Sequence, residues 1–190
     1  SQAQIESAIN DMNDKFGASN TGANTNIQYC LAKRTPSGNA TSGINRINGS
    51  SVTNYSNHGI INNSDFNTVN NIAVKALSVW PNSDYYNIWI VSEINGNNGG
   101  AGTQGYAYFP GAPPSLDGAV ILYNAFGYDP NGTIGHNLKP YTNRNVTANH
   151  ELGHGLNLYH TFEGDGGGAS CPTDLVCGSS SDCVSDTDPH

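Results

Sequence analysis

The sequence predicts an α+β domain, because it contains three stretches with helical spacing, several short apolar runs and a tail without periodicity. The helical stretches open the chain, follow residue 64 and end near residue 157. The short runs are rich in β-branched and aromatic residues, which are typical of strands. A chain of 190 residues can bury one core. We expect a main part over 1–160 and an irregular Cys-, Gly- and acid-rich part over 161–190.

The first helix is predicted over the opening sixteen residues. Five apolar residues recur at helical spacing, namely Ile5, Ala8, Ile9, Met12 and Phe16, and Gly17 ends the pattern. One face of this stretch is therefore apolar, and we expect the helix to cover a sheet.

A second helix is predicted between a cap at Ser64 and Trp80, where Pro81 closes it. The apolar residues expected on its buried face are Phe66, Val69, Ile72, Ala73, Ala76 and Leu77. This face should also pack on the sheet.

Four short runs are predicted to be strands, at residues 27–32, 87–94, 106–109 and 119–123. The run at 87–94 has the clearest buried core. Residues 33–63 are rich in Asn, Gly, Ser and Thr, so we expect mostly loop there.

The composition favours an extracellular protein and excludes two classes of partner. Only 12% of the residues are charged, and the net charge is −8, which repels nucleic acid and anionic membrane surfaces alike. The apolar runs are far shorter than the roughly 20 residues that cross a bilayer. The chain opens at Ser1 without a leader. We therefore expect a processed, secreted protein.

Four cysteines are present, at Cys30, Cys171, Cys177 and Cys183. They suit an oxidising compartment, and structural disulfides are favoured over metal binding or redox chemistry. Spacing alone leaves all three possible pairings open.

The third helix begins near Thr147, whose hydroxyl is a candidate cap. His150 and His154 are four residues apart, so they are separated by about 40° around the axis and project to one side. Two imidazoles can then bind one ion. Leu152 and Leu156 lie on a different face and are expected to anchor the helix in the core.

His160 can join this pair only if the helix ends before it. On a continued helix it would point about 240° away from His154. Asn157 lies between them, and asparagine tolerates the left-handed conformation that ends helices and reverses the chain. Three imidazoles leave a fourth position for water, which is typical of catalytic rather than structural zinc.

Glu151 follows the first histidine. In an HExxH helix this carboxylate accepts a hydrogen bond from the zinc-bound water instead of binding the metal, so it can act as general base. The pattern therefore predicts hydrolysis of a peptide bond by a zinc-activated water, without a covalent intermediate.

These residues resemble the motif HExxHxxGxxH of the metzincin zinc endopeptidases and, within that clan, the pappalysin family. Five further blocks resemble the family in the same order, and they lie at residues 27–32, 87–91, 105–110, 117–121 and 160–164. The resemblance implies a metzincin-like zincin fold, in which a mixed twisted sheet with backing helices and an active-site helix borders a cleft. It also implies zinc on His150, His154 and His160, with Glu151 as base.

The resemblance further implies that a polypeptide substrate pairs antiparallel with an exposed edge strand. Tyr106, Ala107 and Tyr108 are the candidates for that strand. The alternative is an ordinary strand whose aromatic side chains face the core.

Calcium is the second cofactor that the resemblance implies. Residues 181–187 resemble a calcium-binding segment of the family, which makes Asp182 and Thr187 candidate ligands, with Glu163 or Asp165 to complete the site. The alternative is a solvated acidic loop.

Two features depart from the family pattern. Asn157 replaces the motif glycine, a substitution that the left-handed backbone tolerates. Metzincins also carry a methionine turn after the third ligand, whereas the one methionine here, Met12, lies far upstream. We therefore expect either a part of a longer protein, with the missing C-terminal segment as a partner, or a shortened form with impaired activity.

The leading hypothesis is a secreted zinc endopeptidase, made as a zymogen that its own propeptide blocks before activation. The alternative is a catalytically impaired, zinc-stabilised module that binds peptides without cleaving them.

Overall fold

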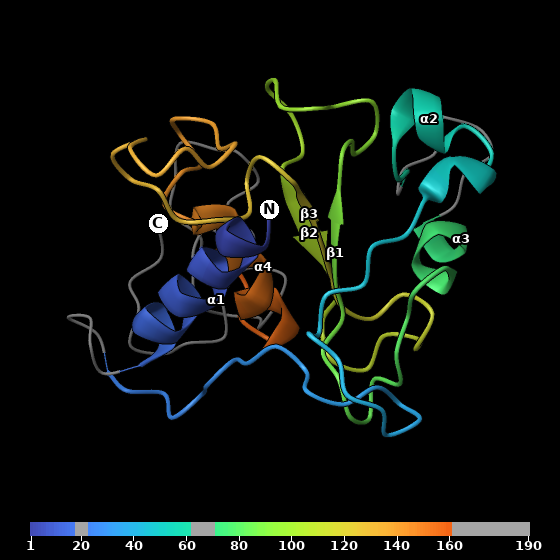
Figure 1. Ribbon diagram of the computed structural model, residues 1–190, viewed down its shortest axis with the longest axis horizontal. Coiled ribbons are helices and arrows are strands. Elements are labelled where there is room, and N and C mark those ends of the chain that lie inside the picture. Colours follow the sequence, from blue (N-terminus) through green and yellow to red (C-terminus); the bar gives the residue numbers. More distant parts are fainter. Residues whose placement is uncertain (18–22, 62–70, 161–190) are drawn as a thin grey trace, which may run out of the picture.

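The computed structural model describes residues 1–17, 23–61 and 71–160. Its helices are α1 (Gln2–Phe16), α2 (Tyr55–His58), α3 (Asn71–Ala76) and α4 (Val146–Gly155), with a short 3₁₀ helix, η1, at Gly49–Ser51. Three strands are formed within these ranges: β1 (Ile88–Val91), β2 (Gly105–Ala107) and β3 (Ala119–Leu122). Helices α1 and α4 lie to one side of the sheet, and α2 and α3 lie to the other (Figure 1).

The sheet is mixed, as predicted, with the strand order β1-β3-β2. Strand β1 runs parallel to β3, with Ile88 opposite Ala119, and β2 runs antiparallel to it, with Tyr106 opposite Val120. All four residues of β3 are fully buried, because helices or loops cover both faces of the central strand. The predicted strands at 87–94, 106–109 and 119–123 are therefore confirmed, although β2 ends at Ala107.

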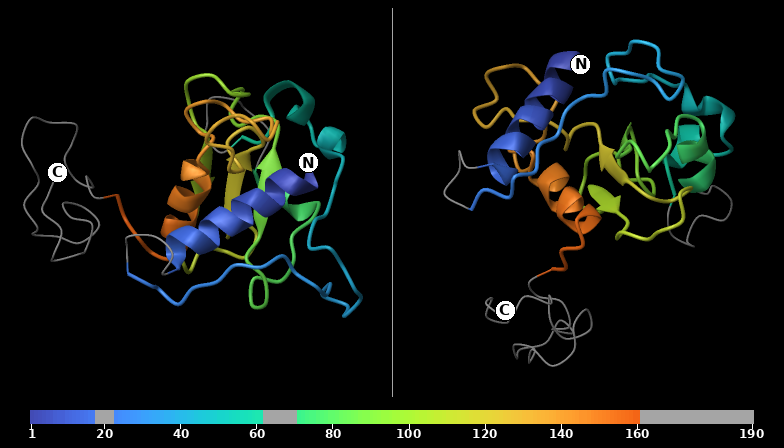
Figure 2. Two further views of the ribbon diagram at one scale, coloured as in Figure 1. Left: turned by 60° about the vertical axis from the view of Figure 1, so that its left-hand side comes forward. Right: turned by 90° about the horizontal axis from the view of Figure 1, so that it is seen from below.

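The predicted strand at 27–32 is wrong. Residues 23–48 instead follow the outside of the molecule as an irregular, mostly extended segment (Figure 2). The side chain of Asn13 on α1 satisfies the backbone of Tyr29 from both sides: the Tyr29 amide donates to Asn13 Oδ1 at 2.7 Å, and Asn13 Nδ2 donates to the Tyr29 carbonyl at 2.9 Å. A side chain thus replaces a neighbouring strand here.

Helix α1 confirms the first predicted helix. Ala8 and Met12 are fully buried, and Gln4 donates to the carbonyls of Tyr123 and Phe126 at 2.7 and 2.9 Å. The helix therefore packs on the chain that follows β3 and on α4, more than on the sheet itself.

Helix α3 corrects the predicted orientation of the second helix. Its buried residues are Asn71, Val74 and Lys75, whereas Ile72 and Leu77 are exposed. The helix ends at Ala76, before Trp80, and the predicted cap and first turns at Ser64, Phe66 and Val69 lie outside the described residues.

Lys75 explains the reversed face of α3. Its Nζ lies 4.6 Å from the ring centroid of Tyr108, 4.9 Å from that of Trp89 and 5.5 Å from that of Tyr106, and it donates to the Leu116 carbonyl. Burial lowers its pKa to about 8, and Asp117 acts in the opposite sense. Cation–π contacts with three rings thus accommodate a lysine where the sequence pattern predicts an apolar side chain.

Segment 33–63, predicted as mostly loop, also contains η1 and α2. The Asn48 side chain caps η1 by accepting from the Ser50 amide at 3.0 Å. None of the described helices combines the length and apolar character that a bilayer crossing requires.

Candidate metal centre

Helix α4 carries the first two histidines and lies against β2, β3 and α1. Its N-cap is Asn145, in the left-handed conformation with φ 56°, so the predicted cap at Thr147 is wrong. Asn145 is fully buried: its Nδ2 donates to the Ala8 carbonyl at 3.0 Å, and its Oδ1 accepts from the Gly127 amide at 3.0 Å. The start of the helix is thereby tied to α1.

The two leucines predicted to anchor α4 differ in burial. Leu152 is 1% exposed and belongs to the core, as predicted, whereas Leu156 is 40% exposed. Leu156 is the C-cap residue, with φ −99°, so it has left the helical register that would bury it. Glu151, which is also buried, shares the inner side of the helix with Leu152.

The chain reverses directly after α4, as predicted. Asn157 has φ 71°, its amide donates to the His154 carbonyl at 2.9 Å, and the Leu158 amide donates to the Gly153 carbonyl at 2.9 Å. This pair of bonds is the Schellman pattern, in which a left-handed residue ends the helix. Asparagine at this position therefore performs the role of the motif glycine.

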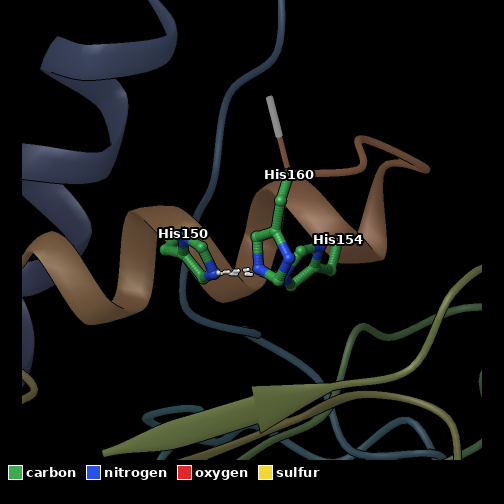
Figure 3. Close-up of side chains that lie close together, drawn as sticks. All are labelled: His150, His154 and His160. Carbon is green, nitrogen blue, oxygen red and sulfur yellow. Dashed lines mark hydrogen bonds between the residues drawn. The ribbon is translucent and has the colours of Figure 1, made fainter. Parts of the chain in front are cut away.

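His160 thereby returns to the two helix histidines (Figure 3). The three Nε2 atoms form a nearly equilateral triangle: 3.0 Å joins His150 to His154, 3.0 Å joins His150 to His160, and 3.1 Å joins His154 to His160. Ligands of a tetrahedral ion with zinc–nitrogen bonds of about 2.0–2.1 Å lie roughly 3.3 Å apart. The three nitrogens therefore fit one zinc ion.

The tautomer and the protonation state of the imidazoles also favour metal binding. His154 Nδ1 donates to the Leu158 carbonyl at 2.8 Å, which leaves the lone pair on Nε2, facing the other two rings. Burial and the two neighbouring histidines lower the pKa of His150. The neutral form, which binds metals, is therefore favoured.

Glu151 lies between α4 and β2. Its carboxylate accepts a hydrogen bond from the Ala107 amide, and burial raises its pKa to about 7. A Cβ atom added at Gly105 would lie 3.0 Å from Glu151 Cγ and 2.9 Å from Thr147 Cγ2. The absence of a side chain at Gly105 therefore lets the helix, with Glu151, approach the strand.

Three contributors to the site were not predicted: Gly105, the Leu158 carbonyl and Phe109. The Phe109 ring stacks on Tyr159 with centroids 4.6 Å apart and meets the His154 ring edge-on at 5.4 Å. The Leu158 carbonyl belongs to the local reversal after α4, four residues from His154. No spacing rule relates Gly105 or Phe109 to the histidines, because these residues meet only in the folded chain.

Several predicted site residues lie outside the described ranges. These are the calcium candidates Asp182, Thr187, Glu163 and Asp165, and three of the four cysteines. Cys30 is exposed. The calcium site and the disulfides thus stay predictions.

Asn157 offers a test of the chain reversal. Asn157→Gly should keep the zinc affinity within about twofold, whereas Asn157→Val should lower it about tenfold or more, because a left-handed residue with a Cβ branch costs at least 1–2 kcal/mol. Titration with a competing chelator measures both. Asn95, with φ 51° in a different turn, provides the control: Asn95→Val should lower stability but not zinc affinity. Equal zinc affinity in all three variants would contradict the role of the reversal.

Comparison with known protein sequences finds a matching family profile and related metalloproteases. The profile of the peptidase M43 family, described as pregnancy-associated plasma protein-A, matches residues 67–190. An extracellular metalloprotease of Colletotrichum graminicola is 40% identical over 89 residues, which are 44% of this chain and 26% of the relative. One from Arthroderma otae is 26% identical over 193 residues, which cover 99% of this chain and 52% of the relative. The chain thus spans between a quarter and about half of these relatives.

Two solved structures are also similar to this chain. Mature mirolysin of Tannerella forsythia, in complex with a cleaved peptide, matches with a TM-score of 0.70 and 31% identity over 98% of this chain and 64% of that chain. Tannerella forsythia promirolysin matches with a TM-score of 0.65 and 30% identity, over 98% and 56%. Since the family profile covers well over half of the residues and includes the three converging histidines, the chain belongs to the pappalysin family of metzincin-type zinc metalloproteases.

Proposed function

We propose that this chain carries the active site of a secreted zinc endopeptidase, which hydrolyses peptide bonds of polypeptides. The observation that carries the proposal is the triangle of Nε2 atoms, 3.0–3.1 Å on a side, beside a buried glutamate that is not part of it. His150, His154 and His160 would hold the zinc. When bound, zinc acidifies a water molecule and polarises the carbonyl under attack.

Glu151 is the proton carrier in this proposal. Its carboxylate takes a proton from the attacking water and returns it to the leaving amine, so no covalent bond to the protein forms. The Ala107 amide orients the carboxylate by donating a hydrogen bond to it. A structural zinc site would have no use for a carboxylate held in this way.

The substrate would pair with the outer edge of β2. Among the described strands, β2 has a neighbour only on its β3 side. The Leu122 amide donates to the Gln104 carbonyl at 2.9 Å, so antiparallel alternation turns the backbone of Tyr106 toward β3 and that of Gly105 and Ala107 toward the open edge. A peptide added there would pass over Glu151.

The rings of Tyr106 and Tyr108 face Lys75, on the α3 side of the sheet. Both alternatives for this strand are thus compatible: its aromatic side chains are packed inside, while no described strand pairs with its outer edge. The Ala107 amide already donates to Glu151, so recognition would rest on the other main-chain groups of this edge, such as the Ala107 carbonyl, more than on the two tyrosine rings.

Secretion and a propeptide are the further parts of the proposal. The curated relatives are named extracellular metalloproteases, and one matched structure is a promirolysin. Calcium at Asp182 and Thr187 is an expectation from the sequence alone. The net charge of −8 disfavours nucleic acid and anionic membranes as partners.

Casein hydrolysis with and without 1,10-phenanthroline tests the proposed function. The chelator should abolish the hydrolysis. Once the chelator has been removed by dialysis, one equivalent of zinc should restore it, since the three imidazoles form a single site. Hydrolysis that persists without zinc would overturn the proposal. Stoichiometric zinc without any turnover would instead favour the peptide-binding module.

A further inference from the structure

The third histidine lies on chain outside α4. The helix ends at Gly155, and the hydrogen bonds of the reversal extend to Leu158, two residues before His160. The position of His160 therefore depends on contacts made by the short segment that leads to it. Tyr159 is the residue of that segment next to the histidine.

Phe109 supplies such a contact. Its ring lies nearly parallel to the Tyr159 ring, at an interplanar angle of 25° and a centroid distance of 4.6 Å. The same ring meets His154 at 5.4 Å and 63°. One side chain, two residues beyond β2, therefore touches both the second histidine and the neighbour of the third.

We propose that Phe109 is a positioning residue that sets the zinc affinity of the site, by holding His154 and the Tyr159–His160 segment in the ligating arrangement before the ion arrives. The inference rests on the proposed zinc site. A ligand set that is already ordered loses less conformational entropy on binding. Aromatic pairs with these centroid distances and angles are attractive in proteins.

The alternative role for Phe109 is a wall of the substrate cleft, since 36% of its surface is exposed. A wall residue would change peptide binding and leave metal binding alone. Zinc affinity measured without substrate separates the two roles.

The test is a zinc titration against a chromophoric chelator, without substrate. Phe109→Leu should raise the zinc dissociation constant about tenfold or more, in the range found for residues that orient metal ligands. Phe109→Tyr keeps the ring and should stay within about twofold of the wild type. Tyr123→Leu is the matched control, because Tyr123 is exposed to the same degree, 37%, on the chain after β3, and it should have no effect.

Tyr159→Leu removes the other ring of the Phe109–Tyr159 stack. It keeps the inference testable if Phe109→Leu fails to fold. It should weaken zinc binding no more than Phe109→Leu, which also loses the His154 contact. The double variant should lose little more than Phe109→Leu alone, because both substitutions remove the same ring stack. Unchanged zinc affinity in Phe109→Leu, or additive losses in the double variant, would overturn the inference. A wild-type chain that binds no zinc would refute the proposed function itself.

Discussion

Glu151→Gln should lower kcat/KM for peptide hydrolysis by about 10²–10⁴-fold, the usual contribution of a general base. Glutamine keeps the shape of the side chain, and its amide oxygen can still accept the bond from the Ala107 amide. It cannot take up a proton from water. Zinc content should stay at one per chain, because Glu151 is not part of the histidine triangle.

Steady-state kinetics and metal analysis of the same preparation measure both parts of this prediction. Glu6→Gln on the exposed side of α1 is the matched control, since it removes the same charge away from the site. Wild-type turnover in Glu151→Gln would show that another group acts as the base. Loss of zinc together with activity would mean that the carboxylate helps to bind the metal.

His160→Ala should lower zinc affinity on the order of 10²–10³-fold, because a site with three protein ligands would keep two. Activity should fall with the bound metal. The remaining pair, His150 and His154, still lies on one side of α4, so weak binding should persist at high zinc concentration. Isothermal titration calorimetry with zinc, together with a circular dichroism spectrum of the metal-free protein, measures the effect.

His136→Ala is the control for this experiment. His136 lies in the loop after β3, where its backbone amide donates to the Asp129 carboxylate, so the variant keeps that bond and should bind zinc like the wild type. If His160→Ala bound zinc as tightly as the wild type, the third ligand would have to be a different residue. The chain reversal at Asn157 would then have no role in the metal site.

The parts of the fold that could be predicted are the helices and strands whose own residues show a helical or apolar pattern. The periodicity of α1 and the apolar runs of β1 and β3 are local patterns, and the structure contains all three elements. The strand predicted at 27–32 has the same kind of pattern and is absent, because Asn13 satisfies the Tyr29 backbone. Strand formation depends on a partner, which a local pattern cannot specify.

The buried face of α3 shows the same limit for a helix. Apolar residues at helical spacing predict that Ile72 and Leu77 point inward, but both are exposed and Lys75 is buried. The lysine is stable there because Trp89, Tyr106 and Tyr108 surround its ammonium group. The three rings come from the sheet and the chain beside it, so the residues of α3 alone cannot indicate that they surround Lys75.

The sequence by itself determined the converging histidines, since helical spacing and the left-handed preference of Asn157 act within a dozen neighbouring residues. Only the tertiary structure decided what surrounds them: the Ala107 amide on Glu151, the bare backbone of Gly105 beneath α4, and the Phe109 ring against His154 and Tyr159. These contacts join β2 and the residues just after it to α4 and the segment that follows α4, far along the chain. Such contacts depend on how whole elements pack, and no local periodicity encodes that packing.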